Sequence, residues 1–141
     1  MRPVGRVAAL GSLARMKDSK NMSPVGWYVG SYVLRFVELA ERGNNDPKRK
    51  FLTWENTVIV TARSLDHAYD KIVAIAKRGT EPYKGGPSPG IDVQWLFEGV
   101  TELLPIYEKL EDGAEIMWAA HPLRGLKKIR SWARTKKQFH Q

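Results

Sequence analysis

The sequence predicts one α+β domain, in which a mainly antiparallel sheet of about five strands packs on one principal helix in the order strand-strand-helix-strand-strand-strand. Three observations lead to this prediction. Several short segments alternate between apolar and polar residues, as strands do. One segment has apolar residues at helical spacing with capping signals at both ends. The length of 141 residues fits a single domain, which can bury enough surface to fold without a disulfide or a structural metal.

The first two predicted strands span residues 27–38 and 51–62. Both alternating sets of the first strand are apolar, so we expect it to be covered on both faces. In the second strand one set, which includes Trp54 and Val60, is apolar, and the other is mostly Thr and Glu and should contact water. Residues 40–50 are rich in loop-forming residues and should connect the two strands as an antiparallel pair.

The principal helix is expected to begin after Ser64 and to end at Gly79. The Ser64 hydroxyl can accept a hydrogen bond from a free amide of the first helical turn. Leu65, Ala68, Ile72 and Ile75 form an apolar stripe at helical spacing, which should pack on the sheet.

Residues 80–90 are predicted to be a loop and residues 92–100 the third strand, with Val93, Trp95 and Phe97 on its buried side. The last two strands are expected at 103–107 and 114–119. The dipeptide Asp112-Gly113 between them favours a tight hairpin.

Charge divides the chain into three parts. The net charge is +8, but residues 124–141 contain seven Lys and Arg and no acid, and residues 1–21 contain five against one acid. The middle therefore has a net charge of −3. We expect a flexible basic leader at 1–21, a mildly acidic α+β domain at 22–123, and a basic amphipathic tail at 124–141 that becomes helical when docked.

Three sequence blocks resemble a known family. They are Trp27-Tyr28-Val29, the passage from Glu55 to Gly79, and Val93 to Val100 followed by Leu110 to Ile116. Together they resemble a bacterial family of small proteins known as a domain of unknown function, numbered four thousand two hundred and eighty-eight. The resemblance implies a compact α+β unit and no known activity.

The residues do not form a recognisable catalytic or cofactor-binding pattern, so we predict no catalytic residue, metal or cofactor. The chain has no cysteine, and its three histidines lack partners at ligand spacing. No glycine-rich loop has a phosphate-binding form. One enzyme alternative is kept, a cleft near Trp95, Glu98 and His121.

The leading interpretation is a non-enzymatic protein-binding domain, in one version a neutralising or immunity-type protein for a basic partner. Its contacts would come from tryptophans, which are enriched at interfaces: Trp27, Trp54, Trp95 and Trp118. A homodimer through sheet edges or an aromatic face is the expected assembly. The absence of cysteine fits a cytoplasmic location, and no apolar run is long enough to cross a membrane.

Nucleic-acid or other anion binding by the tail is the second interpretation. The tail could instead be inert, lie on an anionic membrane, or pack on the acidic surface of the domain. Its candidate residues are the cations and one aromatic: Arg124, Lys127, Lys128, Arg130, Trp132, Arg134, Lys136 and Lys137.

Overall fold

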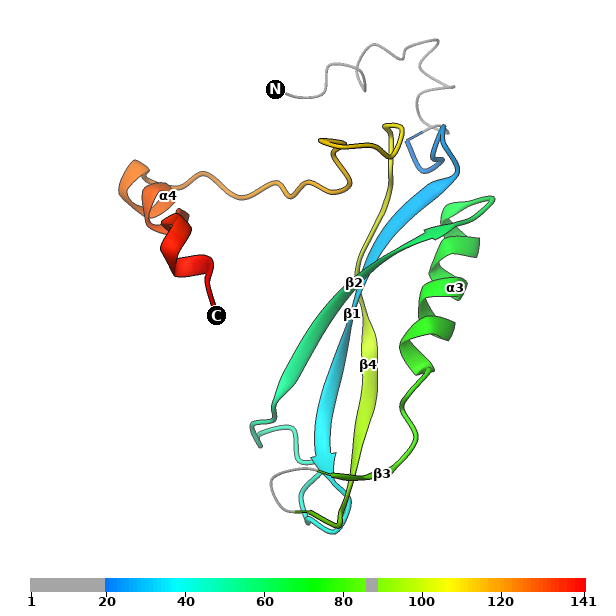
Figure 1. The fold of residues 1–141 in the computed structure, drawn as a ribbon, viewed down its shortest axis with the longest axis vertical. Helices are drawn as coiled ribbons and strands as arrows, with labels where there is room; N and C mark the ends of the chain where they lie inside the picture. Colours follow the sequence, from blue (N-terminus) through cyan, green and yellow to red (C-terminus); the bar gives the residue numbers. More distant parts are fainter. Residues whose placement is uncertain (1–19, 86–88) are drawn as a thin grey trace.

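The computed structural model describes residues 20–85 and 89–141. Four antiparallel strands form a twisted sheet in the order β2-β1-β4-β3, and helix α3 lies against one face of it (Figure 1). The α+β class is confirmed, whereas the prediction of five strands is wrong in number and order. The predicted leader at 1–21 falls outside the described residues, apart from its last two. The strands are β1 (Trp27–Glu38), β2 (Thr53–Thr61), β3 (Tyr83–Gly85) and β4 (Ile91–Pro105), and α3 spans Leu65–Lys77.

β1 is an inner strand with buried residues on both faces, as its two apolar sets predict. It pairs antiparallel with β2 on one side and with β4 on the other. Tyr28 and Tyr32 are buried in the core cluster with α3. Val29 and Val37 are buried on the opposite face. The Ser31 and Thr57 hydroxyls lie 2.7 Å apart there and form a hydrogen bond.

α3 begins and ends where the sequence predicts. The Ser64 hydroxyl accepts a hydrogen bond from the amide of His67 at 3.1 Å, and His67 Nδ1 accepts one from the amide of Arg63 at 3.0 Å. The helix stops before Gly79, whose φ of 73° is accessible to glycine at little cost. Ala68, Ile72 and Ala76 are its buried residues and pack into the core cluster.

Gly30 allows this close packing of α3 on β1. A Cβ atom at this position would lie 2.2 Å from Cδ1 of Ile72 and 3.2 Å from the carbonyl oxygen of Glu102. Because Ile72 is itself fully buried, its side chain has little space to move away.

We therefore predict that Gly30→Ala lowers the free energy of unfolding by about 1–3 kcal/mol, as overpacking does. Gly125→Ala is the matched control, because nothing lies within 4 Å of that Cβ position. Combining Gly30→Ala with Ile72→Val, which removes Cδ1, should cost about 1 kcal/mol less than the sum of the two changes. Urea unfolding measures all four variants, and additive effects would contradict the packing argument.

The third and fourth predicted strands, at 92–100 and 103–107, are one strand, β4. Its register against β1 shifts twice, because Ser31 and Tyr32 face Glu102 and Val100, and Val33 and Leu34 face Gly99 and Phe97. β4 thus contains two extra residues, Thr101 and Glu98, in β-bulges. Each bulge breaks the alternation of side chains locally. The sequence pattern therefore suggested a strand end where the strand continues.

The predicted strand at 114–119 is not formed. The turn at Asp112-Gly113 exists, with a Gly113 φ of 85° and a hydrogen bond from the Ala114 amide to the Glu111 carbonyl. The chain beyond it has no strand hydrogen bonding and packs on the sheet through side chains instead. Part of the predicted loop at 80–90 pairs with β4 as β3, while residues 86–88 fall outside the described residues.

The basic tail contains a short helix, α4 (Leu126–Trp132), and a 3-10 turn, η1 (Lys136–Phe139). The predicted C-terminal helix is confirmed over these seven residues of α4. In the described part of the chain, no helix or strand packs against it, and Figure 1 shows it apart from the sheet. None of the described helices has the length and apolar character needed to span a membrane.

Candidate functional site

The face of the sheet that carries α3 is only partly covered by it. The thirteen residues of α3 extend about 20 Å at about 1.5 Å per residue. The fifteen residues of β4 extend about 50 Å at about 3.3 Å per residue. α3 runs along one half of the sheet (Figure 1), packing on Tyr28, Tyr32 and Val60. The other half of this face has no helix above it.

Aromatic side chains occupy that uncovered half. In the strand register Phe36 lies opposite Trp95 of β4, and Leu34 lies opposite Trp54 of β2, all on the α3 side of the sheet. The Phe36 and Trp95 ring centroids are 5.1 Å apart at an interplanar angle of 58°. Those of Trp54 and Trp95 are 5.2 Å apart at 42°. These tilted contacts are favourable aromatic geometries.

This cluster is open to solvent at its edges. The side chains of Trp54 and Leu52 are each 56% exposed, and Tyr83 of β3 is exposed as well. Leu52 and Tyr83 extend the α3-side surface at either edge of the sheet, through their register with β1 and β4. We call these five residues the aromatic face: Phe36, Leu52, Trp54, Tyr83 and Trp95.

The opposite side of the sheet at the same end is closed by the 39–50 connection. Arg35 holds this connection down, because its Nη1 donates to the Asn44 carbonyl at 2.6 Å and its Nε donates to Glu98 at 2.8 Å. The guanidinium also lies 4.5 Å from the Phe51 ring centroid. Asn44 in turn donates through Nδ2 to the carbonyl of Glu38.

An open polar hollow of about 410 Å³ lies beside this anchor, with Asp46 and Arg49 among its lining residues. The Asn44 Oδ1 atom is buried here without a hydrogen-bond partner in the described chain. The two arginines that line the hollow already donate to backbone carbonyls, Arg35 to Asn44 and Arg49 to Arg42. Arg35 therefore fixes the connection to the sheet, and Arg49 forms a hydrogen bond within the connection.

We predict that Arg35→Met lowers the free energy of unfolding by about 2 kcal/mol, because this side chain is only 17% exposed and two acceptors lose a charged donor. Glu98→Gln should cost about 0–1 kcal/mol, because Glu98 is 45% exposed. Lys84→Met, which removes only the exposed ion pair with Asp92, is the control. Equal losses for Arg35→Met and Lys84→Met in chemical denaturation would refute the anchoring role.

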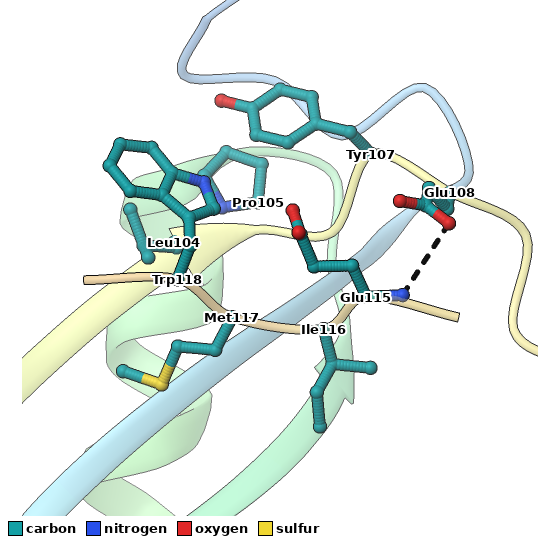
Figure 2. Close-up of a pocket in the computed structure, with 8 residues that line it drawn as sticks. All are labelled: Leu104, Pro105, Tyr107, Glu108, Glu115, Ile116, Met117 and Trp118. Carbon is teal, nitrogen blue, oxygen red and sulfur yellow. Dashed lines mark hydrogen bonds between the residues drawn. The ribbon is translucent and has the colours of Figure 1, made fainter. Parts of the chain in front are cut away.

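A second, much smaller hollow of about 10 Å³ lies at the other end of the sheet. Figure 2 shows it between Leu104 and Pro105 of β4 and the returning residues 115–118. The amide of Glu115 donates to the Glu108 carboxylate at 3.4 Å. This space is about that of one water molecule, so it is a packing gap and not a ligand site. Trp118 contributes to this packing.

The four predicted tryptophans do not form one site. The structure brings Trp54 and Trp95 together, whereas Trp27 lies on the opposite face by strand alternation and Trp118 at the opposite end. Sequence reasoning missed Phe36, Leu52 and Tyr83 as site residues. The sequence did show that Phe36 and Leu52 belong to apolar alternating sets. Both were therefore expected in the core, and the pattern did not reveal that this part of the sheet is uncovered.

The three residues considered for an enzyme cleft, Trp95, Glu98 and His121, have different surroundings in the structure. Trp95 contacts Phe36 on the α3 side, whereas Glu98 pairs with Arg35 on the other side. The His121 ring lies 4.9 Å from the ring of Trp132 in the tail. Within residues 20–85 and 89–141, no three His, Asp or Glu side chains gather as a metal site would require.

The predicted anion-binding residues lie on the exposed tail. Every residue from 124 to 141 is solvent-exposed, and the tail cations surround two aromatic residues. The guanidinium of Arg134 lies 5.0 Å from the Phe139 ring centroid, and Trp132 contacts His121. The cations are therefore accessible but are not arranged in a folded groove.

Comparison with known proteins gives one result. The sequence profile of the family described as "Domain of unknown function (DUF4288)" matches residues 27–118. This range covers the whole sheet, α3 and the returning segment, and it stops before the basic tail. None of the curated proteins and none of the solved structures matches the chain.

Proposed function

Because the chain belongs to this family of unknown function, we propose a role from geometry alone: the protein is a protein-binding domain that recognises its partner with the aromatic face. The observation that carries the proposal is the exposure of Trp54 beside Trp95 and Phe36, beyond the end of α3. Trp and Tyr are the residues most enriched at the energetic centres of protein interfaces.

The arrangement of the aromatic face suits a protein partner. Its centre is apolar and has large rigid side chains, which lose little conformational entropy when they become buried. The strands beneath it are held by β1, which pairs on both sides, so the face is largely preformed. Exposed aromatic clusters of this kind on a folded domain commonly mark interaction sites.

The charge of the domain favours a basic partner. Residues 22–123 have a net charge of −3 within a chain whose total charge is +8, so attraction of a cationic protein would be confined to the surface of the sheet domain. An immunity-type role, in which the domain neutralises a basic toxin, is one form of this proposal. The separation of Trp95, Glu98 and His121 gives the enzyme alternative no support.

Site-specific photo-crosslinking tests this function. A benzophenone amino acid replaces Leu52, on the aromatic face just before β2, or Ile59, which is exposed on the opposite side of β2. In cells that produce the protein naturally, we expect a discrete protein adduct from position 52 only, and its loss when Trp54→Ser is added. Identical adducts from both positions, or none from position 52, would refute a role for this face.

Nucleic-acid binding by the tail is a second candidate, because seven cations between residues 124 and 141 are exposed. Such contacts would be to phosphates and independent of sequence. We predict that the full chain binds single- or double-stranded oligonucleotides at low salt, and that deleting residues 124–141 abolishes this binding. Fluorescence anisotropy at several salt concentrations measures it, with a slope of about −0.7 to −0.9 per phosphate contact. Equal binding by the deleted chain would contradict this candidate.

A further inference from the structure

The tail at residues 124–141 combines exposed cations with exposed apolar side chains, and no described element of the sheet domain packs on its helix. We propose that this tail attaches the protein to bilayers that contain anionic phospholipids. α4 then lies in the plane of the membrane surface, with its apolar side at the boundary of the acyl chains and its cations at the phosphates. This surface is separate from the aromatic face, so the inference goes beyond the proposed function and does not depend on it.

α4 has one apolar side. At about 100° of rotation per residue, its three large apolar residues fall within an arc of about 120°, and they are Leu126, Ile129 and Trp132. Their side chains are 59%, 45% and 45% exposed, and Leu123, just before the helix, is completely exposed. A helix of seven residues is marginal in water by itself, and burial of its apolar side is the usual source of its stability. The tail therefore needs an apolar environment to become a stable helix.

Cations border the apolar side of α4 on both flanks. On the same helical projection Arg130 lies about 40° beyond Leu126, and Lys128 lies about 40° beyond Trp132. Long Lys and Arg side chains in such positions extend their charged ends to the phosphates while their alkyl parts stay near the apolar side. Trp132 suits the same boundary, because its indole ring has an apolar body and one N–H donor.

The whole tail supplies the electrostatic part of the attraction. Residues 124–141 hold seven Lys and Arg and no acid. Beyond α4, the guanidinium of Arg134 lies 5.0 Å from the ring centroid of Phe139, which is 60% exposed, so a cation again adjoins an exposed apolar group. Stable attachment to a membrane takes two signals, and an apolar side combined with a polybasic segment provides both.

The aromatic face gives this tail no charge to bind. The cations Lys50, Lys77 and Arg78 lie near that face and offset its nearby acids, Glu38 and Glu81. A segment with seven cations therefore gains no net attraction there. An anionic bilayer, in contrast, attracts every cation of the tail.

Nucleic acid would use only part of what the tail presents. Phosphates account for the cations, and a base can stack on Trp132, but neither contact buries the aliphatic side chains of Leu126 and Ile129. A bilayer with anionic headgroups accommodates both kinds of side chain at once. The sheet domain, with a net charge of −3 over residues 22–123, would be held away from such a surface, which leaves the aromatic face free.

Vesicle flotation of the full chain tests the attachment. We expect binding to vesicles that contain phosphatidylglycerol and at least tenfold weaker binding to vesicles of phosphatidylcholine alone. Leu126→Ser combined with Ile129→Ser should weaken binding to the anionic vesicles at least tenfold. α4 packs on no described element of the sheet domain, so this change should leave the domain folded. Absence of binding to the anionic vesicles, or full binding by the double variant, would overturn the proposal.

The contribution of charge is measured in the same assay. Each cation near an anionic surface strengthens binding about fivefold, so Lys127→Gln combined with Lys128→Gln should weaken it at least tenfold. Lys48→Gln combined with Lys50→Gln removes two exposed cations from the sheet domain and is the matched control, with an expected change below twofold. Equal losses from the two pairs would show that total charge acts without the tail, and would contradict the proposal.

Single cysteines identify the side of α4 that enters the bilayer, since the chain contains none of its own. An environment-sensitive fluorophore attached at Ile129→Cys should brighten and shift to shorter wavelength on anionic vesicles. The same fluorophore at Ser131→Cys lies on the opposite side of the helix and should change little. Equal responses at the two positions would refute the proposed orientation and the attachment with it.

Duplex DNA separates lipid phosphate from nucleic-acid phosphate. In a mixture of anionic vesicles and duplex DNA at equal phosphate concentration and physiological salt, the full chain should float with the vesicles. The Leu126→Ser, Ile129→Ser chain should lose the vesicles but keep any binding to the duplex at low salt. Retention of the full chain on the duplex would overturn membrane attachment in favour of nucleic-acid binding. Crosslinking at position 52 reports on the aromatic face, so either proposal can fail while the other stands.

Discussion

The mismatch between a helix of about 20 Å and a strand of about 50 Å leaves half of one sheet face without a helix above it. A helix rises less than half as far per residue as a strand, so thirteen residues of α3 cannot cover strands of nine to fifteen residues. The covered half becomes the core around Ile72. The uncovered half forms the aromatic face. Apolar residues of the same alternating set of β1 are therefore buried under α3 in one half of the sheet and partly exposed in the other.

The two faces of the sheet are closed by different means. On the side away from α3, irregular chain covers both ends: the 39–50 connection is held by Arg35, and residues 115–118 pack near Leu104. Side-chain anchors replace strand pairing in both places. As a result Val29, Ser31 and Val37 of β1 are buried on this side.

The two bulges in β4 determine which of its side chains lie on each face of the sheet. By absorbing Glu98 and Thr101 they bring Phe97, Val100 and Leu103 to the same side of the sheet, where all three pack against the core. Glu98 is then free to reach Arg35 on the opposite side, and Thr101 to bond the carboxylate of Glu55. One strand thus supplies the core on one face and polar anchors on the other.

Local patterns in the sequence determined the α+β class, the bounds of β1 and α3, the cap at Ser64, and the separation of a basic tail from an acidic domain. These depend on periodicity, capping and composition, which neighbouring residues decide. Only the tertiary structure decided that two predicted strands are one, that 114–119 packs without pairing, and that Trp54 and Trp95 meet while Trp27 and Trp118 lie elsewhere. Those outcomes depend on register shifts and on how far one element extends over another, and neither is encoded in the pattern of a single segment.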